Sequence, residues 1–278
     1  MKVVLFCGGY GMRMRDEGHD APKPMAMIGD RPLLWHVMRY YAHFGHTEFI
    51  LCLGYGAWAV KDYFLHYDET RSNDFVLRNG GATVDLLSHD IADWTITFVQ
   101  TGLETPIGER LRRVRPHLGD DEMFLANYAD VLTDVSLDDM VQRLTDSDAV
   151  ASMLATPPQS SFHVVRSDDD QRVTDIHSVA TLELRENGGY FVLRREVFDV
   201  LGEGEDLVGH ALPRLAKERK VLAYEYDGFW MPADTLKERA QLEQMFVSGD
   251  RPWALWEGRT EPGVSRRAPR TAIAPSER

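Results

Sequence analysis

Apolar residues follow two different spacings along the first half of the chain. Short continuous apolar runs, which are typical of buried parallel strands, occur at residues 3–7 and 122–130. Residues 32–44 instead carry apolar side chains three and four positions apart, which predicts a helix. Strands that alternate with helices in this way indicate an α/β fold with a Rossmann-like, open and mostly parallel sheet.

The remaining elements follow from the same two spacings. Further strands are expected at 48–56, 94–99, 149–156, 161–166, 172–177, 188–193 and 221–226. Further helices are expected at 57–66, 106–117, 136–146, 195–201, 207–219 and 235–248. Residues 68–92 are polar and irregular, which indicates an insertion with edge strands.

The second half predicts a smaller α+β portion packed on the sheet, because its strands and helices are mixed. We expect one domain over residues 1–258, with its two parts divided near residue 155. Residues 259–278 are rich in Pro, Arg, Ser and Thr and have few large apolar side chains, which predicts a disordered tail.

Charge and composition narrow the classes of function. The formal net charge of -13 over 278 residues argues against a general affinity for nucleic acid or anionic membranes. No apolar run approaches the ~18 residues needed to span a bilayer, and no signal peptide precedes the first strand, so we expect a cytoplasmic protein. Cys7 and Cys52 lie in apolar runs and are expected to be buried and reduced.

A glycine-rich segment, "FCGGYGMRMR", follows the first predicted strand. Gly8, Gly9 and Gly11 allow backbone N–H groups to approach a polyanion without obstruction by a Cβ atom, and Arg13 adds a cation. The segment lacks the third glycine of the dinucleotide-binding pattern, so a dinucleotide-dependent oxidoreductase is a weak alternative. Another alternative is that the glycines only form a tight strand-to-helix turn.

A lysine between two prolines comes next, in "APKPM". Pro22 and Pro24 fix φ on both sides of Lys23, which predicts a stiff, extended segment that presents the lysine to phosphate. The alternative is an ordinary surface lysine.

Two aspartates complete the pattern. Asp130 ends the apolar strand "EMFLANYAD", at the edge where open α/β sheets bind ligands. Asp234 precedes the helix predicted at 235–248, where it can also be a simple N-cap. Two carboxylates without neighbouring histidine or cysteine favour a hard cation such as Mg²⁺, which bridges phosphates.

Taken together, "GGYGMRM", "APKPMAMIGDRPLLWHVM", "ANYAD" and "FWMPADT" resemble the sugar nucleotidyltransferases, and among them the glucose-1-phosphate cytidylyltransferases. The resemblance runs in order from about Met1 to Glu257. It implies the nucleotide-diphospho-sugar transferase fold, a nucleotide-binding part at about 1–155 and a sugar-phosphate-binding part at about 156–258. It also implies Mg²⁺-dependent nucleotidyl transfer from an NTP to a sugar 1-phosphate, release of pyrophosphate, and a homo-oligomer.

The resemblance also assigns residues. Arg13 and Lys23 would be catalytic, and Asp130 and Asp234 would bind Mg²⁺. The nucleotide would be held by Gly8, Gly9, Gly11, Arg13 and Arg110, and the sugar phosphate by Asn187 and Gly188.

Several positions depart from the family pattern. Met12 replaces a threonine, Ala129 replaces the glycine of "YGD", and the lysine of an "EKP" motif is absent from Ile176–Ala180. Histidines stand where the family has glycine and an acid, at His163 and His210. The cations that can take over the phosphate contact are Arg172, Arg185, His163, His177 and His210.

The substrates therefore stay open at this point. CTP is favoured, with GTP or UTP as alternatives. The acceptor can be glucose 1-phosphate, a modified hexose or heptose phosphate, or a cyclitol phosphate. A catalytically silent regulator that binds nucleotide or sugar phosphate is a further alternative.

Overall fold

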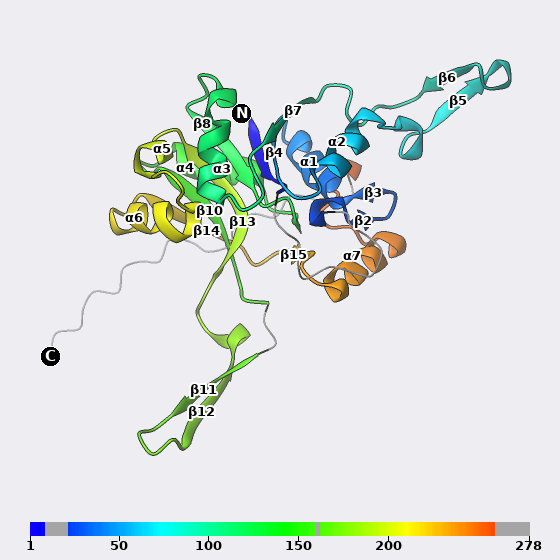
Figure 1. The fold of residues 1–278 in the computed structure, drawn as a ribbon. Coiled ribbons are helices and arrows are strands. Elements are labelled where there is room, and N and C mark those ends of the chain that lie inside the picture. The colour runs from blue at the N-terminus through cyan, green and yellow to red at the C-terminus, as the bar shows by residue number, and fades with distance from the viewer. Residues whose placement is uncertain (9–21, 160–161, 259–278) are drawn as a thin grey trace.

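A seven-stranded sheet forms the centre of the computed structural model, which describes residues 1–8, 22–159 and 162–258 (Figure 1). Its strand order is β14-β10-β13-β8-β1-β4-β7. The strands are β1 Val3–Phe6, β4 Glu48–Leu53, β7 Thr95–Gln100, β8 Met123–Asn127, β10 Ala151–Thr156, β13 Glu186–Arg194 and β14 Val221–Glu225. Only β13 runs antiparallel to its neighbours in this sheet. The predicted open, mostly parallel α/β sheet is confirmed.

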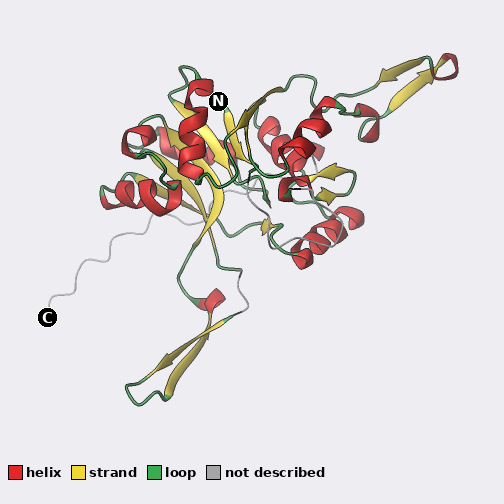
Figure 2. Ribbon diagram, viewed as in Figure 1, coloured by secondary structure: helices red, strands yellow, loops and turns green. Residues whose placement is uncertain are grey.

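Helices cover both faces of the sheet (Figure 2). The helices are α1 Leu33–His43, α2 Ala57–Leu65, α3 Ile107–Val114, α4 Leu137–Thr145, α5 Val197–Val200, α6 Leu212–Lys217 and α7 Leu236–Ser248. Val3 and Leu5 of β1 belong to the core with α1 and α4, whereas Val4 and Phe6 belong to the core with α3, α5 and α6. This two-residue period follows from the pleat of a strand. Cys7 and Cys52 are buried and unpaired, as expected.

Four short strand pairs lie outside the main sheet. They are β2 Met27–Ile28 with β3 Arg31–Pro32, β5 Phe75–Arg78 with β6 Thr83–Leu86, β9 Val131–Thr133 with β15 Trp230–Pro232, and β11 His163–Ser167 with β12 Val173–Ser178. The β5–β6 and β11–β12 hairpins project from the body as two arms (Figure 1). The strands within 68–92 are therefore a separate hairpin, and do not extend the edge of the main sheet.

The second half differs from the smaller α+β portion predicted from the sequence. Two of its strands, β13 and β14, are part of the main sheet, and β13 inserts between β8 and β10. The apolar pattern predicts that a segment is a strand, but the choice of neighbour depends on packing between distant segments. The tail at 259–278, together with Gly9, Gly11, Met12 and Arg13, lies outside the described residues.

The order of the strands indicates where the sheet binds a ligand. From β1 the sheet continues to β4 and β7 on one side, while β8 lies on the other side of β1. In open α/β sheets, ligands bind at such a switch point, outside the carboxyl ends of the strands. Gly8 follows β1, and Tyr128 and Asp130 follow β8. The fold thus brings these residues to one edge of the sheet.

None of the helices in the described ranges combines the length and the apolar character that crossing a bilayer requires.

Candidate functional site

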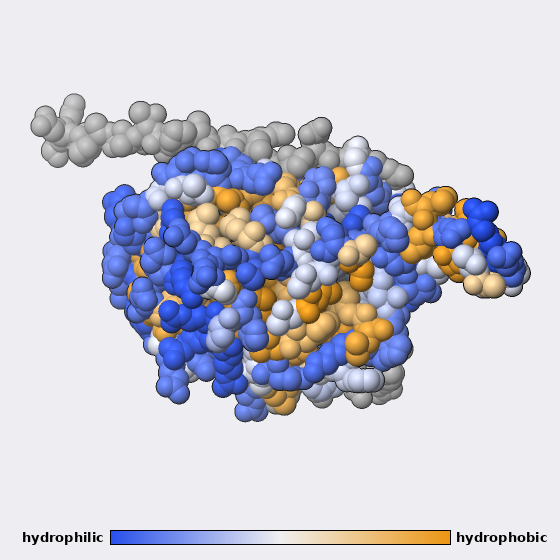
Figure 3. Space-filling model, turned by 90° about the horizontal axis from the view of Figure 1, so that it is seen from above, coloured by the Kyte–Doolittle hydropathy of each residue, from blue (hydrophilic) through white to orange (hydrophobic). Residues whose placement is uncertain are grey.

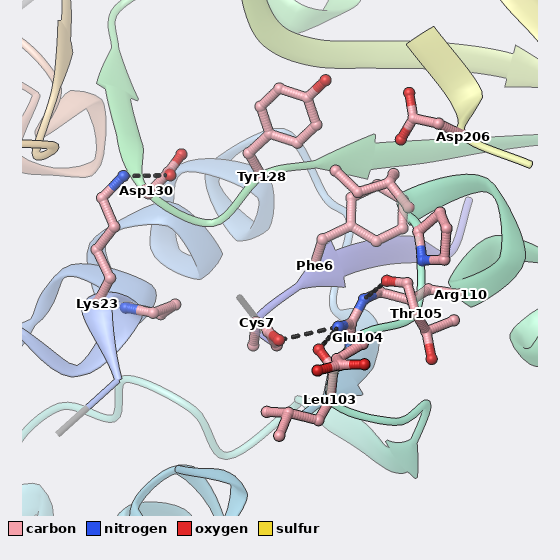
Figure 4. A pocket seen from close by; sticks show the side chains of 14 residues that line it. Phe6, Cys7, Lys23, Leu103, Glu104, Thr105, Arg110, Tyr128, Asp130 and Asp206 are labelled. Atoms are coloured by element: carbon pink, nitrogen blue, oxygen red, sulfur yellow. Dashed lines mark hydrogen bonds and ion pairs between the residues drawn. The ribbon is translucent and has the colours of Figure 1, made fainter. Parts of the chain in front are cut away.

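A cleft of about 500 Å³ opens at this switch point (Figure 4). Its walls come from the ends of β1 and β8, from the segment that follows β7, from the start of α3 and from the turn that carries Lys23. Four residues predicted from the sequence line it: Gly8, Lys23, Arg110 and Asp130.

Lys23, Asp130 and Asp234 meet at one side of the cleft. The ammonium of Lys23 donates a hydrogen bond to Asp130 Oδ2 over 2.7 Å and another to Asp234 Oδ1. The three side chains come from segments that are 107 and 211 residues apart in the sequence. The structure therefore assembles the predicted cation and both predicted metal ligands into one cluster.

The turn that carries Lys23 is tighter than predicted. Lys23 starts a 3-10 turn, Lys23–Met25, in which the Met25 N–H donates to the carbonyl of Pro22 over 2.8 Å. The predicted extended conformation is thus wrong for this lysine, because the fixed φ of Pro24 also suits a 3-10 turn. Pro22 lies against Gly56, where an added Cβ would come within 2.6 Å of the proline ring. The lysine is consequently held on a braced segment.

Local structure explains why the carboxylates of Asp130 and Asp234 are free to face Lys23. Asp130 follows Ala129, whose φ of 61° lies in the left-handed region and whose N–H donates to Asn127 Oδ1 over 2.6 Å. The helix α7 is capped by Thr235, which forms a capping box with Glu238. The alternative that Asp234 is the N-cap is therefore wrong, and its carboxylate faces Lys23 instead.

The charges of this cluster do not balance. Burial raises the pKa of Asp130, and the nearby ammonium of Lys23 acts in the opposite direction. Burial also acts to lower the pKa of Lys23, but the two carboxylates outweigh it, so that this pKa is raised. Two carboxylates against one ammonium leave a partly buried excess of negative charge, which a further cation would neutralise.

The donor set of the cluster fits Mg²⁺. Magnesium binds oxygen ligands, and it commonly uses one or two carboxylates together with phosphates of the substrate. Within the described ranges, no group of three or more His, Cys, Asp and Glu side chains is arranged to hold a metal. Asp130 and Asp234 thus provide a partial ligand set that phosphate oxygens and water can complete.

Arg110 is buried in the wall of the cleft and bonded to the protein on all sides. It is 4% exposed, and burial lowers its pKa. Its donors contact the carbonyls of Gly8 (2.9 Å), Leu53 (3.5 Å), Leu103 (3.0 Å) and Thr105 (2.9 Å) and Thr101 Oγ1 (2.8 Å). No carboxylate of the described residues forms an ion pair with it within 4.0 Å. Arg110 thus joins the ends of three strands and leaves its positive charge unpaired beside the cleft.

Gly8 is required by this arginine. A Cβ atom at Gly8 would lie 2.2 Å from Arg110 Nη1 and 2.8 Å from the backbone nitrogen of Gly54. The sequence pattern predicts that Gly8 lacks a side chain so that a polyanion can approach the backbone. The structure adds a packing reason that the sequence alone does not contain.

Asn187 and Gly188 lie on β13, next to the cleft and behind its lining. Asn187 Nδ2 donates to the hydroxyl of Tyr128 over 3.0 Å, and Tyr128 lines the cleft. The carbonyl of Gly188 accepts from Trp230 Nε1 over 2.8 Å, and a Cβ atom there would meet Leu154 at 2.8 Å. Asn187 therefore reaches the cleft through Tyr128, and its contact with a sugar phosphate stays a prediction.

The cations considered as substitutes for the missing lysine do not line the cleft as the described residues form it. His163 and His177 lie on the β11–β12 arm, and Arg172 precedes β12. Arg185 forms an ion pair with Asp227 over 2.5 Å. His210 Nδ1 accepts a hydrogen bond from the backbone N–H of Asp206 over 3.1 Å. In these positions, none of the five side chains contacts the cluster of Lys23, Asp130 and Asp234.

Tyr128 and Asp206 are among the lining residues of the cleft that the sequence does not predict. Asp206 precedes a π-helical turn, Leu207–Ala211, and its Oδ1 accepts from the N–H groups of Val208 (2.9 Å) and Gly209 (2.7 Å). Its cap position is a signal that the sequence contains. Its place in the cleft depends on long-range packing.

Known proteins share both the sequence and the fold. The family model described as "Nucleotidyl transferase" matches residues 2–237. The chain is 34% identical to the probable glucose-1-phosphate cytidylyltransferase of Bacillus subtilis (strain 168), over 92% of this chain and 100% of that relative. It is 32% identical to the glucose-1-phosphate cytidylyltransferase of Salmonella typhimurium, again over 92% of this chain and 100% of that relative.

A solved structure of the UDP-glucose pyrophosphorylase from Acinetobacter baumanii matches with a TM-score of 0.66 and 17% identity, over 92% of this chain and 96% of that chain. This likeness confirms the fold expected from the resemblance. By its match to the family model and to the two relatives, the chain belongs to the nucleotidyl transferase family and is a sugar nucleotidyltransferase.

Proposed function

We propose that the protein transfers a cytidylyl group from CTP to a sugar 1-phosphate, with Mg²⁺ as cofactor and pyrophosphate as the second product. The observation that carries this proposal is the convergence of Lys23, Asp130 and Asp234 at the switch point, where Lys23 and Asp130 line the cleft and Asp234 contacts Lys23. A phosphate-binding cation and two hard carboxylate ligands are what such a reaction requires at its centre.

The reaction needs alignment and charge neutralisation more than covalent chemistry. An oxygen of the sugar phosphate attacks the α-phosphorus in line, the bond to the β-phosphate oxygen breaks, and pyrophosphate leaves. Lys23 lies where it can exchange its carboxylate contacts for phosphate oxygens and neutralise their charge. Mg²⁺, held by Asp130 and Asp234, would supply Lewis-acid stabilisation of the same charge.

The other predicted site residues would bind the two substrates. Gly8, Gly9 and Gly11, with Arg13, would enclose the triphosphate. The unpaired charge of Arg110 in the cleft wall favours an anionic ligand near it. Asn187 and Gly188 would hold the sugar phosphate on the side of β13.

The choice of CTP rests on the two cytidylyltransferase relatives, which the chain covers over their full length. GTP and UTP stay alternatives. The acceptor proposed first is glucose 1-phosphate, and modified hexose, heptose or cyclitol phosphates are the alternatives, because the lysine of "EKP" is absent.

A grid of substrates tests this proposal. CTP, GTP, UTP, ATP and dTTP are each combined with a set of sugar 1-phosphates, and pyrophosphate release is measured with Mg²⁺ and with excess EDTA. We expect release with CTP in the presence of Mg²⁺ and none with EDTA. The proposal fails if no pair releases pyrophosphate, and its CTP assignment fails if another nucleotide reacts faster.

We also propose that the protein forms a homo-oligomer. This proposal is supported by the apolar side chains that the β5–β6 arm exposes, among them Phe75 and Leu77, which are 42% and 59% exposed.

A further inference from the structure

Asp206 presents a fixed and open hydrogen-bond acceptor to the cleft. One oxygen, Oδ1, is held by the N–H groups of Val208 and Gly209. No described residue donates to the other oxygen, Oδ2. In Figure 4, Asp206 lies on the opposite side of the cleft from Lys23 and Asp130, with Tyr128 and Phe6 between them. The orientation of the carboxylate is therefore set before any ligand binds.

The charge of Asp206 decides which part of a ligand it faces. A carboxylate repels phosphate, so the phosphates of a nucleotide belong at the Lys23 side of the cleft. Phe6 and Tyr128 lie between the two sides, and this aromatic lining suits an uncharged ring. Asp206 thus faces the uncharged end of a substrate, and as a carboxylate it recognises a hydrogen-bond donor there.

Packing places Asp206 on the side of the cleft formed by α3. A Cβ atom at Gly108, in the first turn of α3, would lie 2.4 Å from the carbonyl of Glu205 and 2.9 Å from the backbone nitrogen of Leu207. Residues 205–207 are therefore pressed against the start of α3, beside Arg110 and the loop that precedes it. This side is the one assigned to the nucleotide, whereas the sugar phosphate is assigned to β13.

We propose that Asp206 selects the base of the nucleotide by accepting a hydrogen bond from an exocyclic amino group, which is the 4-amino group in CTP. The inference rests on the proposed function and deepens it. Cytosine has an N–H donor at the position where uracil has a carbonyl acceptor. A carboxylate accepts from the amino group and repels the carbonyl, so Asp206 favours CTP over UTP.

The substitution Asp206→Asn tests this role without removing the helix cap, because Asn and Asp cap helices equally well. The single amide oxygen stays with the cap, so the amide NH2 takes the place of Oδ2 and can only donate, which removes the acceptor for the 4-amino group of CTP. We expect the Kd of Mg-CTP, measured by calorimetry without sugar phosphate, to rise about ten- to hundredfold, as for loss of a hydrogen bond to a charged group. The preference for CTP over UTP should fall by a similar factor.

A CTP analogue without the 4-amino group makes the test specific. Its affinity for the wild-type protein should be lower than that of CTP, and Asp206→Asn should not weaken it further, since the contact is already missing. Glu205→Gln is the matched control, because it removes a neighbouring charge that pairs with Arg214 and does not line the cleft. The control should keep the wild-type preference for CTP.

Two results would overturn the inference. One is an Asp206→Asn variant that keeps the wild-type ratio of CTP to UTP affinity. The other is a change confined to the KM of the sugar phosphate, which would assign Asp206 to a sugar hydroxyl. Both differ from failure of the proposed function, in which the wild-type protein itself releases no pyrophosphate with any substrate pair.

Discussion

At the scale of single residues, Arg110 has a function in the fold that its sequence motif does not reveal. The resemblance assigned it to the nucleotide, but its N–H donors contact backbone carbonyls and Thr101 Oγ1. These contacts fix the carboxyl ends of β1 and β4 and the segment after β7 relative to one another. The cleft wall therefore depends on one buried guanidinium.

The substitution Arg110→Lys should weaken both stability and activity. Lysine keeps the positive charge but has three donors at one point, so several buried carbonyls lose their partner. We expect a loss of about 3 kcal/mol in the free energy of unfolding, on the order expected for unsatisfied buried polar groups. Urea denaturation measures this loss, and kcat/KM should fall at least about tenfold because the cleft wall shifts.

Arg113→Lys is the control on the same helix, since Arg113 is exposed, pairs with Glu109 over 3.1 Å and has one backbone partner, the carbonyl of Thr101 at 2.7 Å, to which a lysine can also donate. It should cost less than about 1 kcal/mol. Unchanged stability of Arg110→Lys, together with a raised KM for the nucleotide alone, would instead show that Arg110 acts mainly as a direct ligand.

At the scale of elements, the β5–β6 arm has one apolar and one polar face. Its register pairs Phe75 with Leu86 and Leu77 with Val84 on one face, while Arg78 and Asp85 form an ion pair on the other. Figure 3 shows hydrophobic surface on this arm, which projects to the right. A two-stranded hairpin is marginally stable alone in water, so an exposed apolar face favours a partner.

The base of this arm is firmly attached to the body. Asp90 is 5% exposed, and its carboxylate accepts from Arg31 (3.3 Å), Tyr67 (2.5 Å), Ser72 (2.5 Å) and Asn73. This network joins both ends of the segment around the hairpin to Arg31, just before α1. The apolar face is thus presented in a defined position, which is what a specific interface requires.

The substitution Leu77→Lys should reduce self-association. A charge in the centre of the apolar face opposes its burial against a second copy, without loss of any core contact within the chain. Sedimentation velocity should give an oligomer for the wild-type protein and a smaller species for the variant, with an unchanged circular dichroism spectrum because the fold of the single chain is kept.

Thr83→Lys places the same charge on the polar face of the same hairpin and should leave the oligomer intact. A wild-type protein that sediments as a monomer of 31.7 kDa would rule out the proposed oligomer. An oligomer that Leu77→Lys leaves unchanged would move the interface away from this arm.

At the scale of the whole molecule, the sequence predicts the sheet and the phosphate-binding cluster better than it predicts their surroundings. Strand and helix positions follow from apolar spacing, and Asp130 could be placed because strand ends in α/β sheets share one edge. Lys23 could be predicted from its two flanking prolines and the glycine-rich segment before it. The place of β13 in the sheet, the Arg110 contacts and the position of Asp206 could not be predicted. Each of these depends on contacts between segments that are distant in the sequence, which local patterns do not specify.

The central claim is that the Lys23, Asp130 and Asp234 cluster carries out nucleotidyl transfer. The most direct test is the rate of pyrophosphate release from CTP and glucose 1-phosphate with Mg²⁺, for the wild-type protein and for Asp130→Asn. Asp120→Asn, at an exposed position outside the cleft, is the control. We predict that kcat falls about a hundred- to thousandfold in Asp130→Asn, as for loss of a group that stabilises transition-state charge, and stays unchanged in the control. Release at the wild-type rate by Asp130→Asn would contradict the account.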